Sequence, residues 1–363
     1  MGLITGTSVD GIDAALVSFE PDITCHAACT LPWPDELRHA ILSLAQGDGV
    51  ITLDELGALD TRIAQQFARA AITLLEQAAV PPAAVRAIGS HGQTVRHRPH
   101  GDAPFSMQLG NPALIAELTG IDCVADFRSA DLAAGGQGAP LLPALHAALF
   151  AKPEHTSVVL NLGGIANITV LHGDGRVAGF DTGPANALLD AWAMQHLGSA
   201  CDVDGAFAAR GQVDSALLDA LLSDPYFHLP PPKSTGRETF HLHWLNAHLP
   251  STPLTPENVQ ATLAALTVRS VADAIHQHAS AATRVLVCGG GVHNPLLMAQ
   301  LRSALAPRDV ISTAEVGIDP DHIEAMAFAW LAQQRLAGQP GNLPSVTGAR
   351  GPRVLGTLAL ASK

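Results

Sequence analysis

Three observations in the sequence predict an α/β protein built from a duplicated domain around a nucleotide site. A strand, a glycine-rich turn and a returning strand occupy residues 2–19, and the same arrangement recurs over residues 158–186. A second kind of strand ends in glycine in each half, at Ile88-Gly89 and at Cys288-Gly289. Helical periodicity separates these units, as in α/β folds. The halves match in organisation rather than residue identity, which suggests two phosphate-contacting hairpins facing each other across a cleft.

The composition is that of a well-buried globular enzyme with two domains. A length of 363 residues exceeds what one hydrophobic core usually supports, and 47% of the residues are hydrophobic while 15% are charged. Lys and Arg number 20 and Asp and Glu number 33, which gives a net charge of −13. That balance argues against nucleic acid or an anionic membrane as the main partner.

The cysteines and histidines predict neither disulfides nor a zinc site. The 5 cysteines are scattered and form no Cys-x-x-Cys, and none of the 17 histidines has the spacing of zinc ligands. The chain shows no signal-peptide pattern and no apolar run of membrane-spanning length. We therefore expect a soluble cytoplasmic protein.

In the first half, a long helix and a strand follow the opening hairpin. Apolar residues at helical spacing predict a helix over residues 52–79, which Pro81-Pro82 ends. Residues 85–88 read as a buried strand that leads into a polar turn. A short helix, a strand and a glycine-rich connection between domains are expected over residues 111–120, 121–125 and 126–140.

In the second half, helices alternate with one further strand. The segment Thr255-Pro256-Glu257 is a good helix start, with a hydroxyl at the N-cap, proline at the first position and an acid in the first turn. Residues 285–288 form a continuous apolar run, typical of a strand covered on both faces. Other helices are expected over residues 186–197, 215–222, 295–305 and 323–336.

The glycine turns predict a clamp for a nucleotide. Glycine lets backbone N–H groups approach a phosphate closely, and Gly289-Gly290-Gly291 would admit a flat base and ribose. The chain has no Walker motif, because Lys233-Ser234-Thr235 lacks the preceding glycines, and no Gly-x-Gly-x-x-Gly follows a strand. Two plainer interpretations stay open: Gly163-Gly164 as a tight hairpin turn, and the triple glycine as a point of close strand–helix packing.

Four motifs resemble those of the anhydro-N-acetylmuramic acid kinases, a family of the sugar kinase, Hsp70 and actin superfamily. The resemblance is collinear over essentially the whole chain and ends at residues 341–349. Thr5 stands where serine is usual in the family, and Ala185 where glycine is usual. The motifs are Gly6-Thr7-Ser8-Val9-Asp10-Gly11-Ile12-Asp13, Asn161-Leu162-Gly163-Gly164, Gly179-Phe180-Asp181-Thr182-Gly183-Pro184 and Cys288-Gly289-Gly290-Gly291-Val292-His293-Asn294.

The resemblance implies two actin-like, ribonuclease H-like domains that flank a nucleotide cleft. The first domain would comprise residues 1–128, joined by part of segment 337–363, and would contact substrate and phosphate. The second, residues 129–336, would contact phosphate and adenosine. The implied reaction converts 1,6-anhydro-N-acetylmuramic acid, ATP and water into N-acetylmuramic acid 6-phosphate and ADP during cell-wall recycling. Homodimerisation is a further family expectation.

By the same resemblance, the glycine turns bind ATP with Mg²⁺. Asp10 and Asp13 are expected as metal partners through water, since Mg²⁺ dehydrates reluctantly. Asp13 could instead face solvent on its strand. The expected nucleotide contacts are Gly6, Thr7, Ser8, Val9, Asp10, Gly11, Ile12, Asp13, Asn161, Gly163, Gly164, Gly289, Gly290, Gly291 and Asn294.

Two carboxylates are the catalytic candidates. Opening the intramolecular ether needs a base that activates water, and Asp181 is the expected base, because it lies among glycine turns near the triphosphate. Its structural alternative is an Asx-turn that caps the helix after Pro184. Glu324 is expected to assist at the sugar, with an ordinary first-turn acid as its alternative.

The lactyl carboxylate of the sugar calls for an arginine. Arg128 is the preferred candidate, with Arg96 and Arg98 as alternatives. His91, Gln93 and Thr94 are expected at the sugar hydroxyls, although a lone histidine is often structural, and Gly138 and Pro140 are expected to shape the floor of the sugar site.

Three rival functions share parts of this pattern. Another sugar or acetate-type kinase would keep Asp181 but change the acceptor. A nucleotide switch of the actin or Hsp70 type would need large additional regions. A phosphohydrolase would turn over ATP without sugar. For a two-domain clamp we expect closure on substrate, from an open apo form to a closed ternary form.

Overall fold

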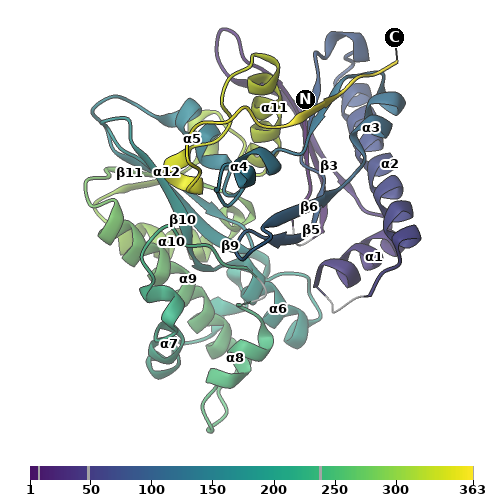
Figure 1. Ribbon diagram of the computed structural model, residues 1–363. Helices are drawn as coiled ribbons and strands as arrows, with labels where there is room; N and C mark the ends of the chain where they lie inside the picture. Colours follow the sequence, from purple (N-terminus) through teal and green to yellow (C-terminus); the bar gives the residue numbers. More distant parts are fainter. Residues whose placement is uncertain (7–8, 47–49, 237–238, 363) are drawn as a thin grey trace. The chain divides into compact units, whose positions relative to one another are not determined.

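The chain folds into two compact units in the computed structural model, which describes residues 1–6, 9–46, 50–236 and 239–362 (Figure 1). Unit 1 comprises Met1–Leu145 and His322–Lys363, and unit 2 comprises His146–Asp321. Each unit has its own hydrophobic core. None of the helices in the described ranges is both long and apolar enough to cross a bilayer.

Unit 1 is built on a six-stranded sheet in the order β13-β7-β4-β1-β2-β3. The first three strands form an antiparallel meander, and β4 and β7 then add in parallel beside β1. A separate hairpin joins two further strands. The strands are β1 (Gly2–Ile4), β2 (Gly11–Ser18), β3 (Thr24–Pro32), β4 (Ile88–Ser90), β5 (Gln93–Arg98), β6 (Phe105–Leu109), β7 (Cys123–Ala125) and β13 (Thr357–Ala359).

Unit 2 repeats this arrangement in a five-stranded sheet of order β10-β9-β8-β11-β12. The first three strands again form an antiparallel meander, and β11 and β12 again add in parallel. Three antiparallel strands followed by two parallel ones, in the same order in both units, is the duplicated ribonuclease H-like fold of actin-like ATPases, as predicted. The strands are β8 (Ser157–Leu162), β9 (Ile165–Leu171), β10 (Val177–Pro184), β11 (Arg284–Cys288) and β12 (Asp309–Ser312).

Helices cover both sheets. In unit 1, α2 begins with a capping box in which the Thr52 hydroxyl accepts from the Glu55 amide and the Glu55 carboxylate accepts from the Thr52 amide. The helices of unit 1 are α1 (Asp35–Gln46), α2 (Leu53–Gln77), α3 (Pro112–Thr119), α4 (Ser129–Ala133), α11 (Ile323–Leu336) and α12 (Pro344–Thr347), with the short helical turn η1 (Pro82–Ala84). Helix α5 (Leu142–Phe150) runs from unit 1 into unit 2.

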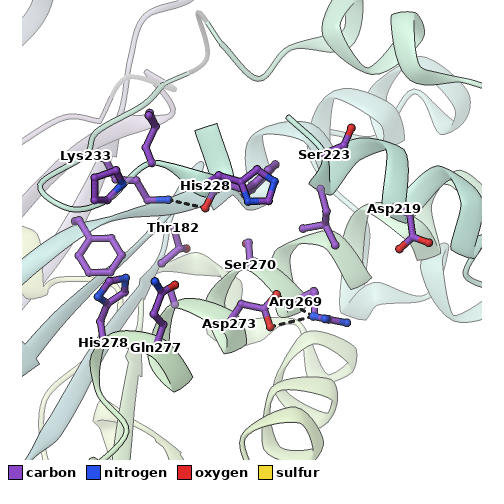
Figure 2. Close-up of a pocket in the computed structure, with 16 residues that line it drawn as sticks. Thr182, Asp219, Ser223, His228, Lys233, Arg269, Ser270, Asp273, Gln277 and His278 are labelled. Atoms are coloured by element: carbon purple, nitrogen blue, oxygen red, sulfur yellow. Dashed lines mark hydrogen bonds and ion pairs between the residues drawn. The ribbon is translucent and has the colours of Figure 1, made fainter. Parts of the chain in front are cut away.

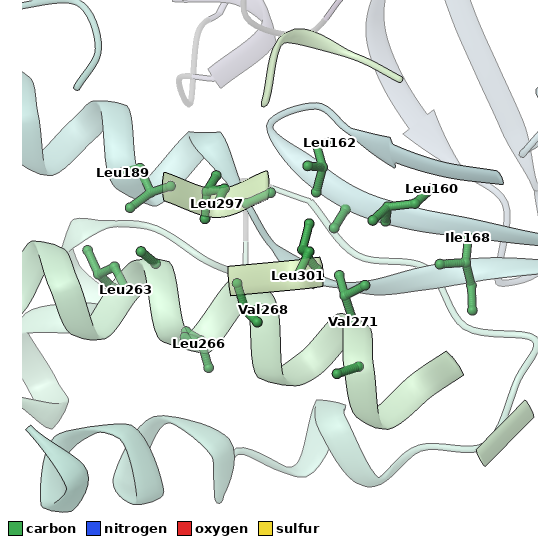
Figure 3. Close-up of a cluster of buried hydrophobic side chains, with 14 of the residues drawn as sticks. Leu160, Leu162, Ile168, Leu189, Leu263, Leu266, Val268, Val271, Leu297 and Leu301 are labelled. Atoms are coloured by element: carbon green, nitrogen blue, oxygen red, sulfur yellow. The ribbon is translucent and has the colours of Figure 1, made fainter. Parts of the chain in front are cut away.

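The core of unit 2 lies between its sheet and helix α9. Leu263, Leu266 and Val271 of α9 belong to one buried cluster with Leu160 and Ile168 of the sheet (Figure 3). Helix α9 starts at the predicted N-cap, where Thr255 accepts from the amide of Asn258. The helices are α6 (Asn186–Leu197), α7 (Ser215–Leu222), α8 (Leu242–His248), α9 (Pro256–His278) and α10 (Pro295–Leu305), with the short turns η2 (Val203–Gly205), η3 (Ala208–Arg210), η4 (Pro225–His228), η5 (Gly290–His293) and η6 (Thr313–Val316).

Helix α11 crosses the unit 1 sheet so closely that two strand positions have room only for glycine. A Cβ atom on Gly2 of β1 would overlap the carbonyl oxygen of Ala325, and one on Gly89 of β4 would overlap that of Phe328. This close approach fixes the start of α11, where Glu324 lies, against the sheet of unit 1.

The boundaries between the units differ from the expected ones at two places. Residues 129–145 belong to unit 1 rather than to the second domain, so the first crossing comes after Leu145. Residues 322–336 also belong to unit 1, because α11 packs on β1, β2 and β4. The prediction assigned residues 323–336 to the second domain because they follow it in the sequence. The contact of α11 with Gly2 and Gly89 has no signal in the sequence.

Candidate active site

Asp181 lies in a polar row that crosses the sheet of unit 2. In the strand register, Asn161 of β8 is opposite Asn167 of β9, and Asn167 is opposite Asp181 of β10. Cross-strand partners project on the same face of a sheet. The neighbours Phe180 and Thr182 therefore project on the opposite face. Asn167 was not among the predicted site residues, and only the strand register reveals it.

One segment holds both the main chain and the side chain of Asp181. The Asp181 amide donates to the carbonyl oxygen of Lys233 at 3.1 Å, and the Tyr226 hydroxyl donates to the Asp181 carbonyl oxygen at 2.7 Å. The Thr235 amide donates to the Asp181 carboxylate oxygen Oδ2 at 2.9 Å. Burial and the Asp181 carboxylate both raise the pKa of Tyr226, so its hydroxyl stays a donor.

The alternative role of Asp181 as a helix cap is wrong. The first amides of α6 are bound by the hairpin turn instead: Ala185 and Ala187 donate to the Gly164 carbonyl, and Asn186 donates to that of Gly163. The N-cap position of α6 has no side-chain cap. Gly163-Gly164 is therefore a hairpin turn whose carbonyl groups are anchored on α6.

The three consecutive glycines after β11 have different surroundings. A Cβ atom on Gly289 would overlap the Asn161 side chain, and one on Gly291 would lie 2.5 Å from Leu162 Cβ, so both positions are points of close packing. Among the described residues, no atom beyond the neighbours in the chain lies within 4 Å of a Cβ built on Gly290. The Asn294 side-chain oxygen caps α10 by accepting from two helix amides, at 3.1 and 3.2 Å.

The N-terminal turn is only partly described, because Thr7 and Ser8 lie outside the described residues. Val9 and Ile12 are fully buried in the core, so a ligand at this turn would meet only their backbone. Gly6 is exposed, and its carbonyl accepts from the Val9 amide at 3.2 Å. Gly11 pairs with Pro32 of β3, where a Cβ would overlap the Thr30 side chain.

The two carboxylates of this turn differ in environment. Asp10 is exposed and pairs with Arg38 at 3.6 Å, whereas Asp13 accepts from the Thr30 hydroxyl at 2.6 Å. Within the ranges that the structure describes, no three His, Cys, Asp or Glu side chains form a metal site. An exposed carboxylate beside a phosphate-binding turn still fits an ion held mainly by phosphate and water.

The predicted sugar residues come together in unit 1. The Arg128 guanidinium donates to His91 Nε2 at 2.8 and 3.2 Å and to the Gly138 carbonyl at 2.7 Å. Burial lowers the pKa of Arg128 to about 10, while the carboxylates of Glu324 and Asp131 favour its charged form. Residues that are far apart in the sequence, including both segments of unit 1, thus surround one guanidinium.

His91 is a neutral acceptor in this cluster. Burial and then the charge of Arg128 hold its pKa well below the usual range. Its ring also stacks near Phe328 of α11, with the ring centroids 4.6 Å apart. His91 therefore both supports the packing of α11 and orients Arg128.

Two buried oxygens lie beside His91. Ser90 Oγ and Gln93 Oε1 belong to fully buried residues and make no hydrogen bond to any other described part of the chain. Buried polar atoms are normally paired, so these two oxygens are available to polar groups that the described residues do not supply. The Thr94 hydroxyl is less available to a ligand, because it already accepts a hydrogen bond from the Gln108 side-chain amide at 3.0 Å.

Arg96 and Arg98 are less suited to a carboxylate than Arg128. The Arg96 guanidinium donates to the backbone carbonyl of Leu44 near the end of α1 and to that of Val95 in its own strand, and Arg98 donates to the adjacent His97 carbonyl. Arg128 is thus the predicted arginine that the structure places in the cluster with His91 and Glu324.

Asp131 was not predicted as a site residue, yet it holds in place the loop that was expected to form the sugar floor. Its fully buried carboxylate accepts from the Gly138 amide at 2.8 Å, from Asn342 at 2.6 Å and from the Thr347 hydroxyl at 2.7 Å. It joins the loop that contains Gly138 and Pro140 to the C-terminal segment. An aspartate three residues after Arg128 carries no signal of this role in the sequence.

A cavity of about 600 Å³ lies on the face of β10 away from Asp181 (Figure 2). Thr182 projects into it, together with Lys233, Ser270 and His278, whereas Asp181 is not among its lining residues. The cavity is therefore distinct from the polar row.

Two ribonuclease H-like units with glycine turns at strand ends are the architecture of actin-like ATPases, and the match to a kinase family places this chain among the phosphotransferases of that fold class. The family model described as "Anhydro-N-acetylmuramic acid kinase" matches residues 1–361, and the chain belongs to this family. It is 55% identical to an anhydro-N-acetylmuramic acid kinase of Xanthomonas campestris pv. campestris, over 99% of this chain and 96% of the relative. Kinases of the same name from Xylella fastidiosa and Burkholderia orbicola are 54% and 52% identical, over 99% and 98% of this chain and 95% of each relative.

Proposed function

We propose that this protein uses ATP and water to convert 1,6-anhydro-N-acetylmuramic acid into N-acetylmuramic acid 6-phosphate and ADP, in the cytoplasm, during murein recycling. Its family and its full-length relatives support the substrate. The structural observation that carries the mechanism is the Asp181 carboxylate on the polar face of β10, fixed by the Thr235 amide. Such a carboxylate is suited to accept a proton from water.

In this mechanism Asp181 removes a proton from a water molecule as its oxygen attacks C1 of the sugar. The C1–O6 bond breaks, and O6 attacks the γ-phosphorus of ATP in line with the departing ADP oxygen. A C1–OH bond and an O6–P bond form, and the proton passes from Asp181 to solvent. Ring opening and phosphoryl transfer are thus coupled, since the leaving oxygen of one is the nucleophile of the other.

The residues of unit 1 would hold the sugar. Arg128 would bind the lactyl carboxylate, since a guanidinium pairs with a carboxylate through two parallel N–H donors. Ser90 and Gln93, whose buried oxygens lack protein partners, would bind hydroxyl or amide groups. Glu324, which acts electrostatically on Arg128, would orient it, and Gly138 and Pro140 would form the floor.

Each unit has glycine turns suited to contact ATP. Gly6 of unit 1 is exposed, and in unit 2 no described atom beyond the neighbours in the chain lies within 4 Å of a Cβ built on Gly290, while the nearest atom to one on Gly163 is at 3.5 Å, so phosphate or ribose would have access to the backbone there. Asn161 would lie beside the Gly289 turn, which it contacts. Mg²⁺ would be held by the phosphates, with Asp10 and Asp13 binding its water ligands. When bound, the ion neutralises charge that develops on the phosphoryl oxygens. Homodimerisation and closure on substrate belong to the same proposal.

A single-turnover assay in ¹⁸O-labelled water tests this function. With wild-type protein, ATP and the anhydro sugar, we expect label on C1 of a 6-phosphorylated product. Asp181→Asn should abolish both label and product, while Asp174→Asn, in an exposed turn of unit 2, should leave both unchanged. Hydrolysis of ATP without sugar phosphorylation would instead indicate a phosphohydrolase.

A further inference from the structure

Asp181 occupies an edge position that the sheet alone fixes poorly. Strand β10 is the outermost strand of its sheet. One edge of β10 pairs with β9, and the other edge has no strand beside it in the described sheet. The register between β9 and β10 also shifts between Asp181 and Gly183. A bulge at an edge strand redirects a side chain and weakens the local ladder. The orientation of the carboxylate therefore depends on what binds the open side of β10.

Residues 226–235, hereafter the edge segment, bind that open side. Three hydrogen bonds reach Asp181 from it: one to the amide from the Lys233 carbonyl, one from the Tyr226 hydroxyl and one from the Thr235 amide. Together they hold both peptide groups of Asp181 and one carboxylate oxygen.

The two ends of the edge segment are packed differently. Tyr226 is buried in the core of unit 2, where its ring centroid lies 5.4 Å from that of Phe240, and Phe227 packs against the same core. Leu229, Pro230 and Lys233 line the cavity of about 600 Å³, in which Figure 2 labels Lys233. On this side the segment borders open space, so polar contacts add to the constraint that packing supplies at Tyr226.

Lys233 supplies those contacts. Its ammonium group donates to the carbonyl oxygens of Tyr226 at 3.1 Å and Phe227 at 3.3 Å, and lies 4.7 Å from the centroid of the Tyr226 ring. These interactions draw the two ends of the edge segment together. The ammonium also lies within electrostatic range of the Asp181 carboxylate, which partly offsets the lowering of the Lys233 pKa by burial.

We propose that Tyr226 and Lys233 are positioning residues that fix the Asp181 carboxylate for proton abstraction. The inference rests on the proposed function, in which Asp181 is the base. A displacement of a catalytic group by about 1 Å can cost roughly 100-fold in rate, so a few hydrogen bonds to the base have a large effect. The Lys233 charge also keeps the carboxylate ionised at lower pH.

Two substitutions test the proposal. Tyr226→Phe removes only the hydroxyl, and Lys233→Met removes the ammonium but leaves the backbone carbonyl that binds Asp181. We expect kcat for the anhydro sugar to fall about 10-fold to 100-fold in each, with KM for sugar and ATP within about twofold. Lys233→Met should also move the acid limb of the kcat profile to higher pH, and Lys233→Arg should restore most of the rate.

Thr267→Val is the matched control. The Thr267 hydroxyl is buried and donates to the Pro184 carbonyl at 3.0 Å, so the variant loses a similar bond to β10 without touching Asp181. We expect its kcat to stay within about twofold of wild type.

Tyr226 is the single tyrosine of the chain, so fluorotyrosine labelling gives one fluorine NMR signal. That signal should shift in Asp181→Asn and Lys233→Met but not in Thr267→Val.

The outcomes separate the inference from the function. If Asp181→Asn is inactive while Tyr226→Phe and Lys233→Met keep the wild-type kcat and pH profile, the positioning role is refuted and the function stands. If Asp181→Asn still opens the ring, the base itself is misassigned. A loss of kcat in Lys233→Met that Lys233→Arg does not restore would also contradict the role of the charge.

Discussion

The Arg128 guanidinium donates from both Nε and Nη2 to Nε2 of His91. Because this nitrogen accepts, the proton of the neutral ring is on Nδ1, and burial together with the Arg128 charge keeps the ring neutral. In the proposed function this pair forms one side of the sugar site, and its geometry depends on the planar fork of arginine.

Arg128→Lys should therefore impair sugar binding more than ATP binding. A lysine retains the charge but cannot make the paired contacts to His91 Nε2 and Gly138. We expect KM for the sugar to rise at least about tenfold, or about 1.4 kcal/mol, with KM for ATP unchanged. Arg98→Lys is the control, because Arg98 is exposed and donates only to the neighbouring His97 carbonyl among the hydrogen bonds described for it. Equal KM values for the two variants would contradict the assignment of Arg128.

Gly290→Ala should separate nucleotide binding from folding. The added methyl group meets no protein atom within 4 Å, so the midpoint of thermal unfolding should not change. If ATP lies against this turn, its Kd, measured by calorimetry, should rise about tenfold because the methyl group occupies ligand space. Gly289→Ala should instead lower stability, since its φ is 80° and its Cβ would overlap Asn161. Unchanged ATP affinity in Gly290→Ala would place the nucleotide elsewhere.

Asp131→Asn should destabilise unit 1. The substitution places an amide group where a buried carboxylate accepts from Gly138, Asn342 and Thr347, so at least one donor loses its partner. We expect the free energy of unfolding to fall by about 2 kcal/mol in urea titrations. Asp174→Asn, whose exposed carboxylate pairs with Arg176, should change it little. Equal unfolding free energies of the two variants would mean that the hydrogen bonds of Asp131 do not stabilise unit 1.

Stability should fall as the pH drops below about 6.5. Burial lowers the pKa of His146 to about 3. In the unfolded chain this histidine binds a proton below about pH 6.5, whereas in the folded protein it stays neutral, so the unfolded state gains protons. Each such residue removes up to about 1.4 kcal/mol per pH unit below pH 6.5, until the pH reaches its folded-state pKa, which is about 3 for His146. His97, with a pKa of about 4, acts in the same direction.

His146→Gln should reduce this dependence. Urea titrations at several pH values should give a shallower loss of unfolding free energy on acidification than in wild type. His39→Gln is the control, because His39 is an exposed residue of α1. A slope equal to that of wild type would mean that His146 becomes protonated without unfolding.

The repeated topology could be predicted because local patterns determined it. Apolar runs that end in glycine, at Leu162 and at Cys288, mark strand ends, and the proline after Thr255 marks a helix start. These signals depend only on neighbouring residues. The short strands β12 and β13 and the hairpin of β5 and β6 were not predicted, because their stability depends on pairing with residues that are distant in the sequence.

The site could be predicted only in part. Asp181 and Arg128 were found from motifs, but the partners that orient them were not. Tyr226 and Asp131 act through contacts that span 45 and 211 residues of sequence, respectively, and neither lies in a motif. Such contacts follow from tertiary packing, which residue spacing does not encode.

The packing of α11 on Gly2 and Gly89 also affects the order in which the two units fold during synthesis. Unit 2 is one continuous stretch and can complete its core as soon as Asp321 has left the ribosome. Unit 1 emerges first but must wait, because the helix that covers β1 and β4 is encoded after unit 2. A nascent chain therefore carries an uncovered sheet face through most of translation, and a chain that terminates before residue 322 never covers it.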